Sequence, residues 1–233
     1  MKCSFCGMVI MPGEQYLYDI HGNTAHAHHS TELCPVCERI IGQSSSNGKI
    51  NYPDGRYICG HCNMNENPVN DRILLKQAFD NAKELLQEKG FDFPKVTVHF
   101  ASKEDFFRMG YHNGTLGLTT SVIGIGQTTH KITILYGLPM LLSSGILGHE
   151  LLHVWQNNNG IRVDPYICEG VCELGSGLIY KRSDTVLGKL LFDKLERNML
   201  KTYSDGFIAM KNMLETYGWQ AVREYVKQNS KLY

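Results

Sequence analysis

The stretch Gly148–His153, with the sequence GHELLH, decides how this chain is interpreted. On an α-helix, positions i and i+4 lie one turn apart on the same face, so His149 and His153 can both point a ring nitrogen at one metal ion. Glu150 then lies beside that ion. A zinc ion with three protein ligands keeps a fourth position for water, and a neighbouring carboxylate can take a proton from that water. The stretch therefore predicts the HExxH site of a zinc metallopeptidase.

Glu169, sixteen residues after His153, is the expected third ligand. Apolar residues recur at helical spacing after it, which predicts a second helix that can lay this carboxylate against the first helix. Asp164 is the competing third ligand, but it precedes Pro165 in an expected loop, and a rigid helix holds a ligand more accurately. Two histidines and a glutamate make a site of the gluzincin type. Glu173, one turn further along, is placed to accept the second N–H of a ligating histidine.

Two histidines and a glutamate also occur on ordinary surface helices, so the short pattern needs support from elsewhere in the chain. A metzincin site would need a glycine and a third histidine after the second one, and Gln156 and Asn159 occupy those positions. Cys168 and Cys172 flank the expected third ligand at helical spacing. Buried small side chains are more common than metal ligands at such positions, so both cysteines are left outside the predicted site.

The first 62 residues hold six of the eight cysteines, arranged as three C-x-x-C pairs. Such pairs, interleaved with histidines, have the spacing of zinc ligands, and thiols stay reduced in a cytosol. We expect two tetrahedral zinc sites, one formed by Cys3, Cys6, His26 and His29 and the other by Cys34, Cys37, Cys59 and Cys62. His28 is an alternative to His29. Both ions are expected to be structural, because so small a unit gains its folding free energy from metal binding.

The composition limits the partners of the protein. Its 23 basic side chains balance 23 acidic ones, so no net charge attracts it to nucleic acid or to an anionic membrane. The first residues lack the apolar run of a signal peptide, and the most apolar region, residues 132–155, is interrupted by glycine, proline and ionisable residues. These patterns predict a globular, cytoplasmic protein without nucleic-acid or membrane partners.

Hydrophobic periodicity predicts an α+β fold for most of the chain. Polar residues 63–70 predict a linker between a double zinc module, residues 1–65, and a peptidase domain, residues 71–233. Asp71 is expected to cap a helix that Gly90 ends. The other expected helices are 102–109, 139–160, 167–182, 184–203, 206–217 and 219–229, the expected strands are 96–100, 115–120, 122–127 and 131–136, and an exposed hairpin tip is expected at 44–48.

With these residues in place, the sequence resembles the LIM-domain, ubiquitin-dependent zinc peptidases known from plants as the DA-one family. The resemblance rests on the cysteine-rich module and on the blocks Ile134–Pro139, Ile146–Trp155, Glu169–Cys172 and Tyr203–Phe207. It implies a gluzincin-like peptidase whose zinc ligands are His149, His153 and Glu169 and whose base is Glu150. It also implies limited cleavage of regulatory proteins, and it adds ubiquitin or ubiquitinated proteins to the partners to be tested.

We therefore predict an α+β protein in which a LIM-like double zinc module, used for protein docking, precedes a gluzincin-like zinc endopeptidase. One catalytic and two structural zinc ions are expected, and protein or peptide substrates. Tyr180 and Tyr203 are candidates for the donor that stabilises the oxyanion. The alternative is a non-catalytic LIM-type adaptor with a vestigial peptidase domain, against which the intact Glu150 argues.

Overall fold

The computed structural model describes residues 1–43, 48–111, 114–124 and 128–231 of the chain. The chain divides into two compact units, Met1–Pro68 and Val69–Tyr233. The expected hairpin tip, except for residue 48, and the last three residues of the expected strand 122–127 lie outside the described residues.

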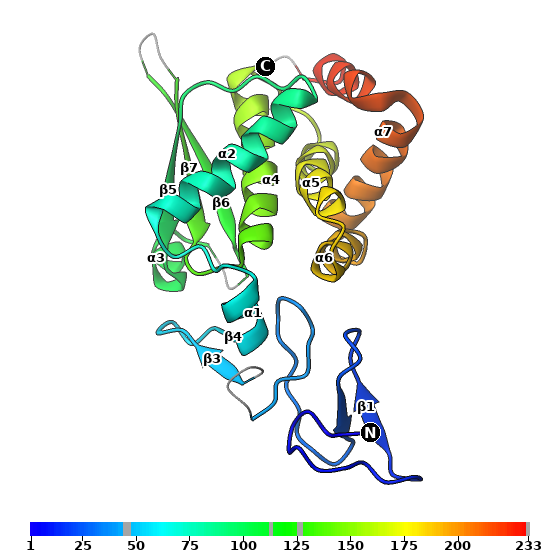
Figure 1. Ribbon diagram of the computed structural model, residues 1–233. Coiled ribbons are helices and arrows are strands. Elements are labelled where there is room, and N and C mark those ends of the chain that lie inside the picture. The colour runs from blue at the N-terminus through cyan, green and yellow to red at the C-terminus, as the bar shows by residue number, and fades with distance from the viewer. Residues whose placement is uncertain (44–47, 112–113, 125–127, 232–233) are drawn as a thin grey trace. The chain divides into compact units, whose positions relative to one another are not determined.

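Short hairpins build the first unit (Figure 1). Strand β1 (Tyr16–Tyr18) pairs antiparallel with β2 (Thr24–His26), and β3 (Lys49–Asn51) pairs antiparallel with β4 (Tyr57–Cys59). Helix α1 (Gly60–Asn65) follows β4 directly. The second strand of each hairpin therefore ends at a histidine or cysteine of one of the two expected zinc sets.

A buried carboxylate connects two segments of the first unit through hydrogen bonds. Asp19 is 7% exposed, and its oxygens accept hydrogen bonds from the backbone N–H groups of His21 and Ile40, each at 2.8 Å, and from Asn23. Burial alone would raise the pKa of Asp19, but these hydrogen bonds outweigh it and lower the pKa. The carboxylate thus ties the first hairpin to the segment that follows the second cysteine pair.

The boundary between the two units falls within the expected linker at residues 63–70, but both ends of this stretch are ordered. Residues 60–65 form α1, because the thiol of Cys59 accepts from the N–H of Cys62 at 3.4 Å and caps the helix. Val69 is fully buried, and its N–H donates to the carbonyl oxygen of Leu138 at 2.8 Å. Hydrogen bonds of the backbone therefore order both ends of this polar stretch.

The second unit contains a three-stranded sheet in the order β5-β7-β6. Strand β5 (Val96–Ala101) runs parallel to β7 (Thr128–Leu135), and β6 (Gly117–Ile123) pairs antiparallel with β7. The prediction of separate strands at 115–120 and 122–127 is wrong, because one continuous register pairs all of β6 with β7. The central strand β7 is the most buried of the three, and β6 lies at an edge.

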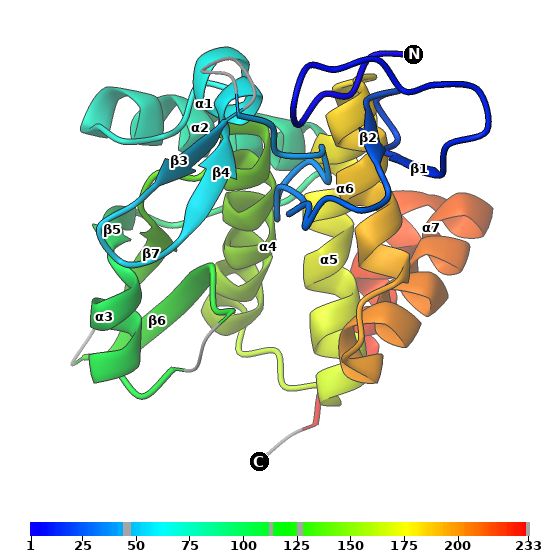
Figure 2. The same cartoon turned by 90° about the horizontal axis from the view of Figure 1, so that it is seen from below.

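Helices cover the sheet in successive layers. In both views α4 (Met140–Asn158) lies between the sheet and α5 (Pro165–Arg182), and α7 (Lys201–Gln228) lies on the far side of α5 (Figures 1 and 2). Helix α2 (Arg72–Glu88) packs on α4, and α6 (Val186–Glu196) packs on α5 and α7. Helix α4 is thus enclosed, which explains why it is apolar on almost all sides.

Local signals explain where several helices begin and end. The carboxylate of Asp71 accepts the first free N–H groups of α2, and Gly90, with a φ of +83°, follows its last turn. Ser102 and Asp105 form a reciprocal capping box at the start of α3 (Lys103–Arg108). These three predictions are confirmed.

The expected helix 184–203 is wrong, because residues 197–200 separate α6 from α7. The side-chain oxygen of Asn198 accepts from the N–H of Leu200 at 3.0 Å, a local hydrogen bond that competes with helix formation. The expected break after residue 217 is present as a kink within α7 at Gly218, whose φ of +79° suits glycine. Within the described residues, none of the helices is long and apolar enough to span a membrane.

Candidate metal centre

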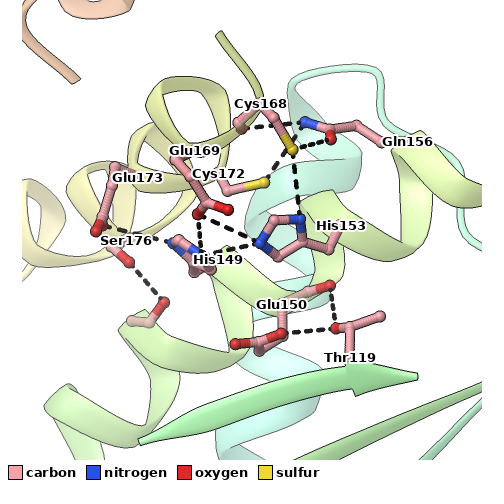
Figure 3. Close-up of polar contacts among 11 residues, drawn as sticks. Thr119, His149, Glu150, His153, Gln156, Cys168, Glu169, Cys172, Glu173 and Ser176 are labelled. Atoms are coloured by element: carbon pink, nitrogen blue, oxygen red, sulfur yellow. Dashed lines mark hydrogen bonds and ion pairs between the residues drawn. The ribbon is translucent and has the colours of Figure 1, made fainter. Parts of the chain in front are cut away.

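Helices α4 and α5 approach each other closely at a pair of glycines. A Cβ atom on Gly175 would lie 2.6 Å from the carbonyl oxygen of Gly148, and a Cβ atom on Gly148 would lie 3.0 Å from the carbonyl oxygen of Gly175. Only glycine fits at both positions without moving a backbone. This close approach brings His149 and His153, on α4, opposite Glu169, on α5 (Figure 3).

The ligating atoms of these three residues form a small triangle. The Nε2 atoms of His149 and His153 are 3.1 Å apart, and Oε2 of Glu169 lies 3.3 Å from the first and 3.5 Å from the second. Bonds of about 2.0–2.1 Å to a tetrahedral zinc ion place nitrogen and oxygen ligands about 3.3–3.4 Å apart. The triangle therefore has the size that a zinc ion requires.

An unsatisfied oxygen points to the same conclusion. Oε2 of Glu169 is buried and makes no hydrogen bond of acceptable geometry to any described residue, although the two imidazole nitrogens face it. Buried polar atoms without a hydrogen-bond partner are rare in folded proteins, and those that occur often contact a bound ion. A cation held in the triangle would satisfy this oxygen.

The charges of the metal-free triad are coupled. Burial lowers the pKa of His153, but the contacts with Cys168 and Glu169 outweigh it and raise this pKa to about 9. Burial would raise the pKa of Glu169, but the two imidazoles hold it at about 2. The pKa of His149 is also raised, against burial, mainly by the charge of Glu173. A metal ion that enters the triangle at neutral pH therefore displaces protons from the histidines.

Asp164, the competing third ligand, and Glu173, the predicted partner of a ligand ring, have other contacts. Oδ1 of Asp164 accepts from the N–H of Tyr166 at 2.9 Å, so this carboxylate caps α5. Glu173 lies where the helical spacing predicts, with Oε2 3.6 Å from Nδ1 of His149. Asp164 thus caps α5 from the position before its first residue, whereas Glu169 completes the triangle and Glu173 contacts the His149 ring.

Both cysteines of α5 lie closer to the triad than predicted. Sγ of Cys168 is 3.8 Å from Nδ1 of His153, and Cys172 is fully buried and falls within a potential metal-binding group with both histidines. The cause is the close packing of α4 on α5, which puts the helix face that carries positions 168 and 172 against the HExxH helix. Their spacing of four residues, on either side of Glu169, was the available signal.

Glu150 is held by a residue that the sequence did not reveal. The hydroxyl of Thr119, on β6, lies 2.7 Å from Oε2 of Glu150 and 3.0 Å from its carbonyl oxygen (Figure 3). Glu150 is 6% exposed. A threonine in a strand carries no spacing signal, so only the packing of the sheet on α4 identifies this contact.

A cavity of about 630 Å³ opens beside His149 and Glu150. Much of its wall is apolar and is formed by Leu142, Ile146, Leu191, Leu195 and Leu200. Both candidate tyrosines line it as well. The ring of Tyr203 lies nearly parallel to that of His149, with centroids 6.3 Å apart, and burial raises the pKa of Tyr203 to about 12, so its hydroxyl is protonated at neutral pH. Tyr180 is 4% exposed, and burial raises its pKa more than it raises the pKa of Tyr203.

The expected zinc ligands of the first unit gather in two groups, Cys3, Cys6, His26 and His29, and Cys34, Cys37, Cys59 and Cys62. In the second group the Sγ atoms of Cys34 and Cys62 are 3.9 Å apart and those of Cys37 and Cys59 are 3.6 Å apart. Zinc–sulfur bonds of about 2.3 Å give tetrahedral edges of about 3.8 Å. The second group therefore has the dimensions of a closed zinc site.

The first group uses His29 rather than His28. Nδ1 of His26 lies 3.6 Å from Sγ of Cys6 and 3.3 Å from Nε2 of His29, and His28 is outside the group. Nε2 of His26, which points away from these ligands, lies 3.5 Å from Oε2 of Glu14. The buried donor sets, together with the free thiols, suggest that this unit binds zinc and are compatible with a LIM-like module.

Comparisons with known proteins relate the chain to DA1-like proteins. Residues 105–180, which include all four residues proposed for the HExxH site, match the family model described as "DA1-like: Protein DA1". The chain is 22% identical to Protein DA1 of Arabidopsis thaliana over 301 aligned residues, covering 99% of this chain and 56% of that protein. It is 26% identical to Protein DA1-related 2 of the same plant over 217 residues, covering 77% of this chain and 39% of the relative.

A relative from rice, LIM domain-containing protein HDR3 of Oryza sativa subsp. japonica, is 23% identical over 189 residues, which are 66% of this chain and 37% of HDR3. The chain thus spans about half or less of the length of these curated relatives. No solved structure matches the chain. Taken together, the matches support a relationship of this chain to the DA1-like family, which has a LIM-domain protein among its relatives.

Proposed function

We propose that this protein is a zinc-dependent endopeptidase that makes limited cleavages in regulatory proteins. The observation that carries the proposal is the triangle of His149, His153 and Glu169, with an unsatisfied buried oxygen at one corner and Glu150 beside it on the same helix. Two imidazole nitrogens and one carboxylate oxygen are a donor set of catalytic zinc sites. When bound there, zinc would polarise the scissile carbonyl and acidify a water molecule.

The residues of the chain would divide the remaining work. Glu150 takes a proton from the attacking water as the new C–O bond forms, and it returns a proton to the amine nitrogen as the C–N bond breaks. Thr119 holds the carboxylate of Glu150 in place through its hydroxyl. Tyr203 is the better candidate to donate to the oxyanion, because its ring stacks on His149 and is only partly buried, whereas Tyr180 is enclosed.

The surroundings of the triad are suited to an extended peptide. Strand β6 is at the edge of the sheet next to α4, so it can pair with a substrate backbone. The apolar wall of the neighbouring cavity offers room for a large apolar side chain next to the scissile bond. Docking of partners on the LIM-like module, recognition of ubiquitin or ubiquitinated proteins, and a cytoplasmic location remain parts of the proposal that rest on the resemblance and on the sequence.

The test compares Glu150→Gln with the parent, both loaded with zinc. We expect Glu150→Gln to keep three zinc ions and to lose about 10²–10⁴ in cleavage rate, because the amide cannot act as a base. Glu84→Gln makes the same chemical change at an exposed position of α2 and is the matched control. Cleavage of a proteome-derived peptide library identifies the products.

Two results would contradict the proposal in different ways. Equal cleavage by Glu150→Gln and the parent would show that the base is misassigned. A parent protein that holds three zinc ions and cleaves no peptide would instead favour the adaptor, in which the LIM-like module binds a partner and the HExxH helix is vestigial. His149→Ala, which removes a corner of the triangle, identifies the third ion in both cases.

A further inference from the structure

The two histidines of the triangle are supported by chemically different groups. Nδ1 of His149 faces the carboxylate of Glu173, whereas the group that faces Nδ1 of His153, within the described part of the chain, is the thiol of Cys168 at 3.8 Å (Figure 3). Because Nε2 of each ring points into the triangle, Nδ1 carries the ring proton and needs an acceptor. A thiol is an unusual acceptor at this position, and it can accept only if its sulfur is held with a lone pair toward the ring.

The sulfur is itself held by Gln156. Sγ of Cys168 donates to Oε1 of Gln156 at 2.9 Å. Nε2 of the same amide donates in the opposite direction, to the carbonyl oxygen of Cys168 at 3.3 Å and to Sγ of Cys172 at 3.5 Å. Gln156 is 3% exposed, so water does not compete for these groups.

Donors and acceptors are matched along these contacts. The two bonds donated by the amide nitrogen fix which end of Gln156 faces the thiol, and this leaves the amide oxygen to accept the thiol proton. With its proton directed at Gln156, the sulfur presents a lone pair to the N–H of His153. The contacts join α4, which carries His153 and Gln156, to α5, which carries Cys168.

We propose that Cys168 and Gln156 form a hydrogen-bond relay that orients the ring of His153 for metal binding. The proposal rests on the metal centre of the proposed function. Both residues are positioning residues, since each acts through His153 and neither has a part in the chemistry. The relay fixes the rotation of the His153 ring and so holds its Nε2 atom at 3.1 Å from the His149 nitrogen and 3.5 Å from the Glu169 oxygen.

A rival explanation makes Cys168 a ligand itself, because His153, Cys168 and Glu169 also form a potential metal-binding group. The two explanations differ in what they require of Gln156. A relay needs the amide oxygen to direct the thiol proton, whereas a thiolate bound to a metal ion needs no proton and no amide acceptor. The consequence of changing Gln156 therefore separates them.

The experiment measures the dissociation constant of the third zinc ion in the full chain by competition with a chelator. Cys168→Ala and Gln156→Met each interrupt the relay, and we expect each to weaken zinc binding by about 10–100-fold. The double variant should be no weaker than the singles, because all three interrupt the same chain of contacts. Cys168→Ser keeps a group that can both donate and accept, so it should weaken zinc binding less than Cys168→Ala.

Ser143→Ala is the matched control. It removes another buried hydrogen bond of α4, from the Ser143 hydroxyl to the carbonyl oxygen of Leu138 at 3.1 Å, and touches no histidine. Its zinc affinity should stay within about twofold of the parent, since no ligand ring is released. Thermal unfolding verifies that each variant is folded, and because each relay member has its own variant, one misfolded protein leaves the test intact.

Several outcomes overturn the relay. Parent-like zinc affinity in Cys168→Ala excludes it directly. If Cys168→Ala weakens zinc binding and Gln156→Met does not, the Cys168 thiol is a metal ligand instead. If Ser143→Ala weakens zinc binding equally, the effect comes from helix packing. Strictly additive losses in the double variant also contradict a single relay. A parent protein with only two zinc ions overturns the proposed metal centre and the relay together, whereas the other outcomes leave the metal centre standing.

Discussion

The two units of this chain bury different kinds of side chain. Of the twelve largest fully buried side chains among the described residues, Ile40 alone lies in Met1–Pro68, and the other eleven, among them Phe91, Phe106 and Phe207, lie in Val69–Tyr233. The first unit buries cysteines instead, with Cys3, Cys34, Cys37, Cys59 and Cys62 each 0–2% exposed. From this comparison we expect metal binding to stabilise the fold of the first unit, whereas in the second unit an apolar core positions the candidate ligands.

The candidate metal groups of the two units also differ in their number of ligands. A zinc ion held by the four thiols of the second group would have no position left for water, so we expect it to serve structure alone. The triangle on α4 and α5 has three corners and lies beside a cavity, so an ion held there can still bind another molecule. Because of this difference, we expect metal removal to unfold the first unit, which is the largest effect. The smallest expected effect is a small change in kcat after a substitution beside the triangle.

Metal removal should have the largest effect and should be confined to the first unit. Structural zinc sites contribute apparent free energies of about 10–16 kcal/mol in zinc-finger peptides, far more than a core of this size provides. After exhaustive chelation we expect hydrogen exchange to lose protection throughout the four strands and α1, while the central turns of α4, α5 and α7 stay protected. Equal loss of protection in both units would contradict the comparison.

Gly175→Ala should damage the second unit without touching a ligand. The added Cβ would lie 2.6 Å from the Gly148 carbonyl oxygen, so α4 and α5 must separate, and overpacking of this kind costs about 1–3 kcal/mol. Chemical denaturation should show this loss in the second unit, together with weaker binding of the third zinc ion. Gly177→Ala is the control, because the nearest atoms to its Cβ would belong to the Phe192 and Phe207 rings, at 3.2–3.4 Å, and not to a backbone. An equal loss in both variants would show that the close approach of the backbones is not what positions the triad.

The third zinc ion should bind more tightly as the pH rises. Below about 9 His153 is protonated in the metal-free protein, and the raised pKa of His149 adds a second proton that zinc must displace. Glu169, with a pKa of about 2, stays ionised and contributes no proton. Each displaced proton weakens zinc binding by about 1.4 kcal/mol per pH unit below the histidine pKa. Titrations at pH 6, 7 and 8 should give between one and two protons per zinc, and a flat profile would mean that the histidines are not the ligands.

The fold was predictable from sequence where a local rule applies. Capping by Asp71 and Ser102 and the helical periodicity around the HExxH stretch depend on neighbours within a few residues, and the structure has these elements. The gap between α6 and α7 is not predictable in this way, because it contains a hydrogen bond from the N–H of Leu200 to the side chain of Asn198. A local hydrogen bond of this kind does not change the spacing of apolar residues, so hydrophobic periodicity cannot predict it.

For the residues around the triad as well, contacts within one helix are predictable from sequence, and contacts between elements are not. The spacing of His149 and His153 places two ring nitrogens on one helix face, and the structure holds them 3.1 Å apart. Thr119, by contrast, is thirty-one residues from Glu150 and lies on a different element, so its contact depends on how β6 packs against α4. Sequence spacing does not reveal the contact of Cys168 with His153 for a related reason, since it depends on the close approach of α4 and α5 at Gly148 and Gly175.

The smallest expected effect belongs to Thr119→Val, which changes neither the metal ligands nor the shape of the side chain. The Thr119 hydroxyl has one proton to share between two oxygens of Glu150, so its loss should cost only about 1 kcal/mol, roughly a fivefold fall in kcat. The zinc content and the midpoint of thermal unfolding should stay at the parent values, because the role of Thr119 is to orient a carboxylate. Thr119→Ser restores the hydroxyl and should restore kcat. If Thr119→Val cleaves at the parent rate, the carboxylate of Glu150 is held by its own burial, and the apolar packing of the second unit alone positions the base.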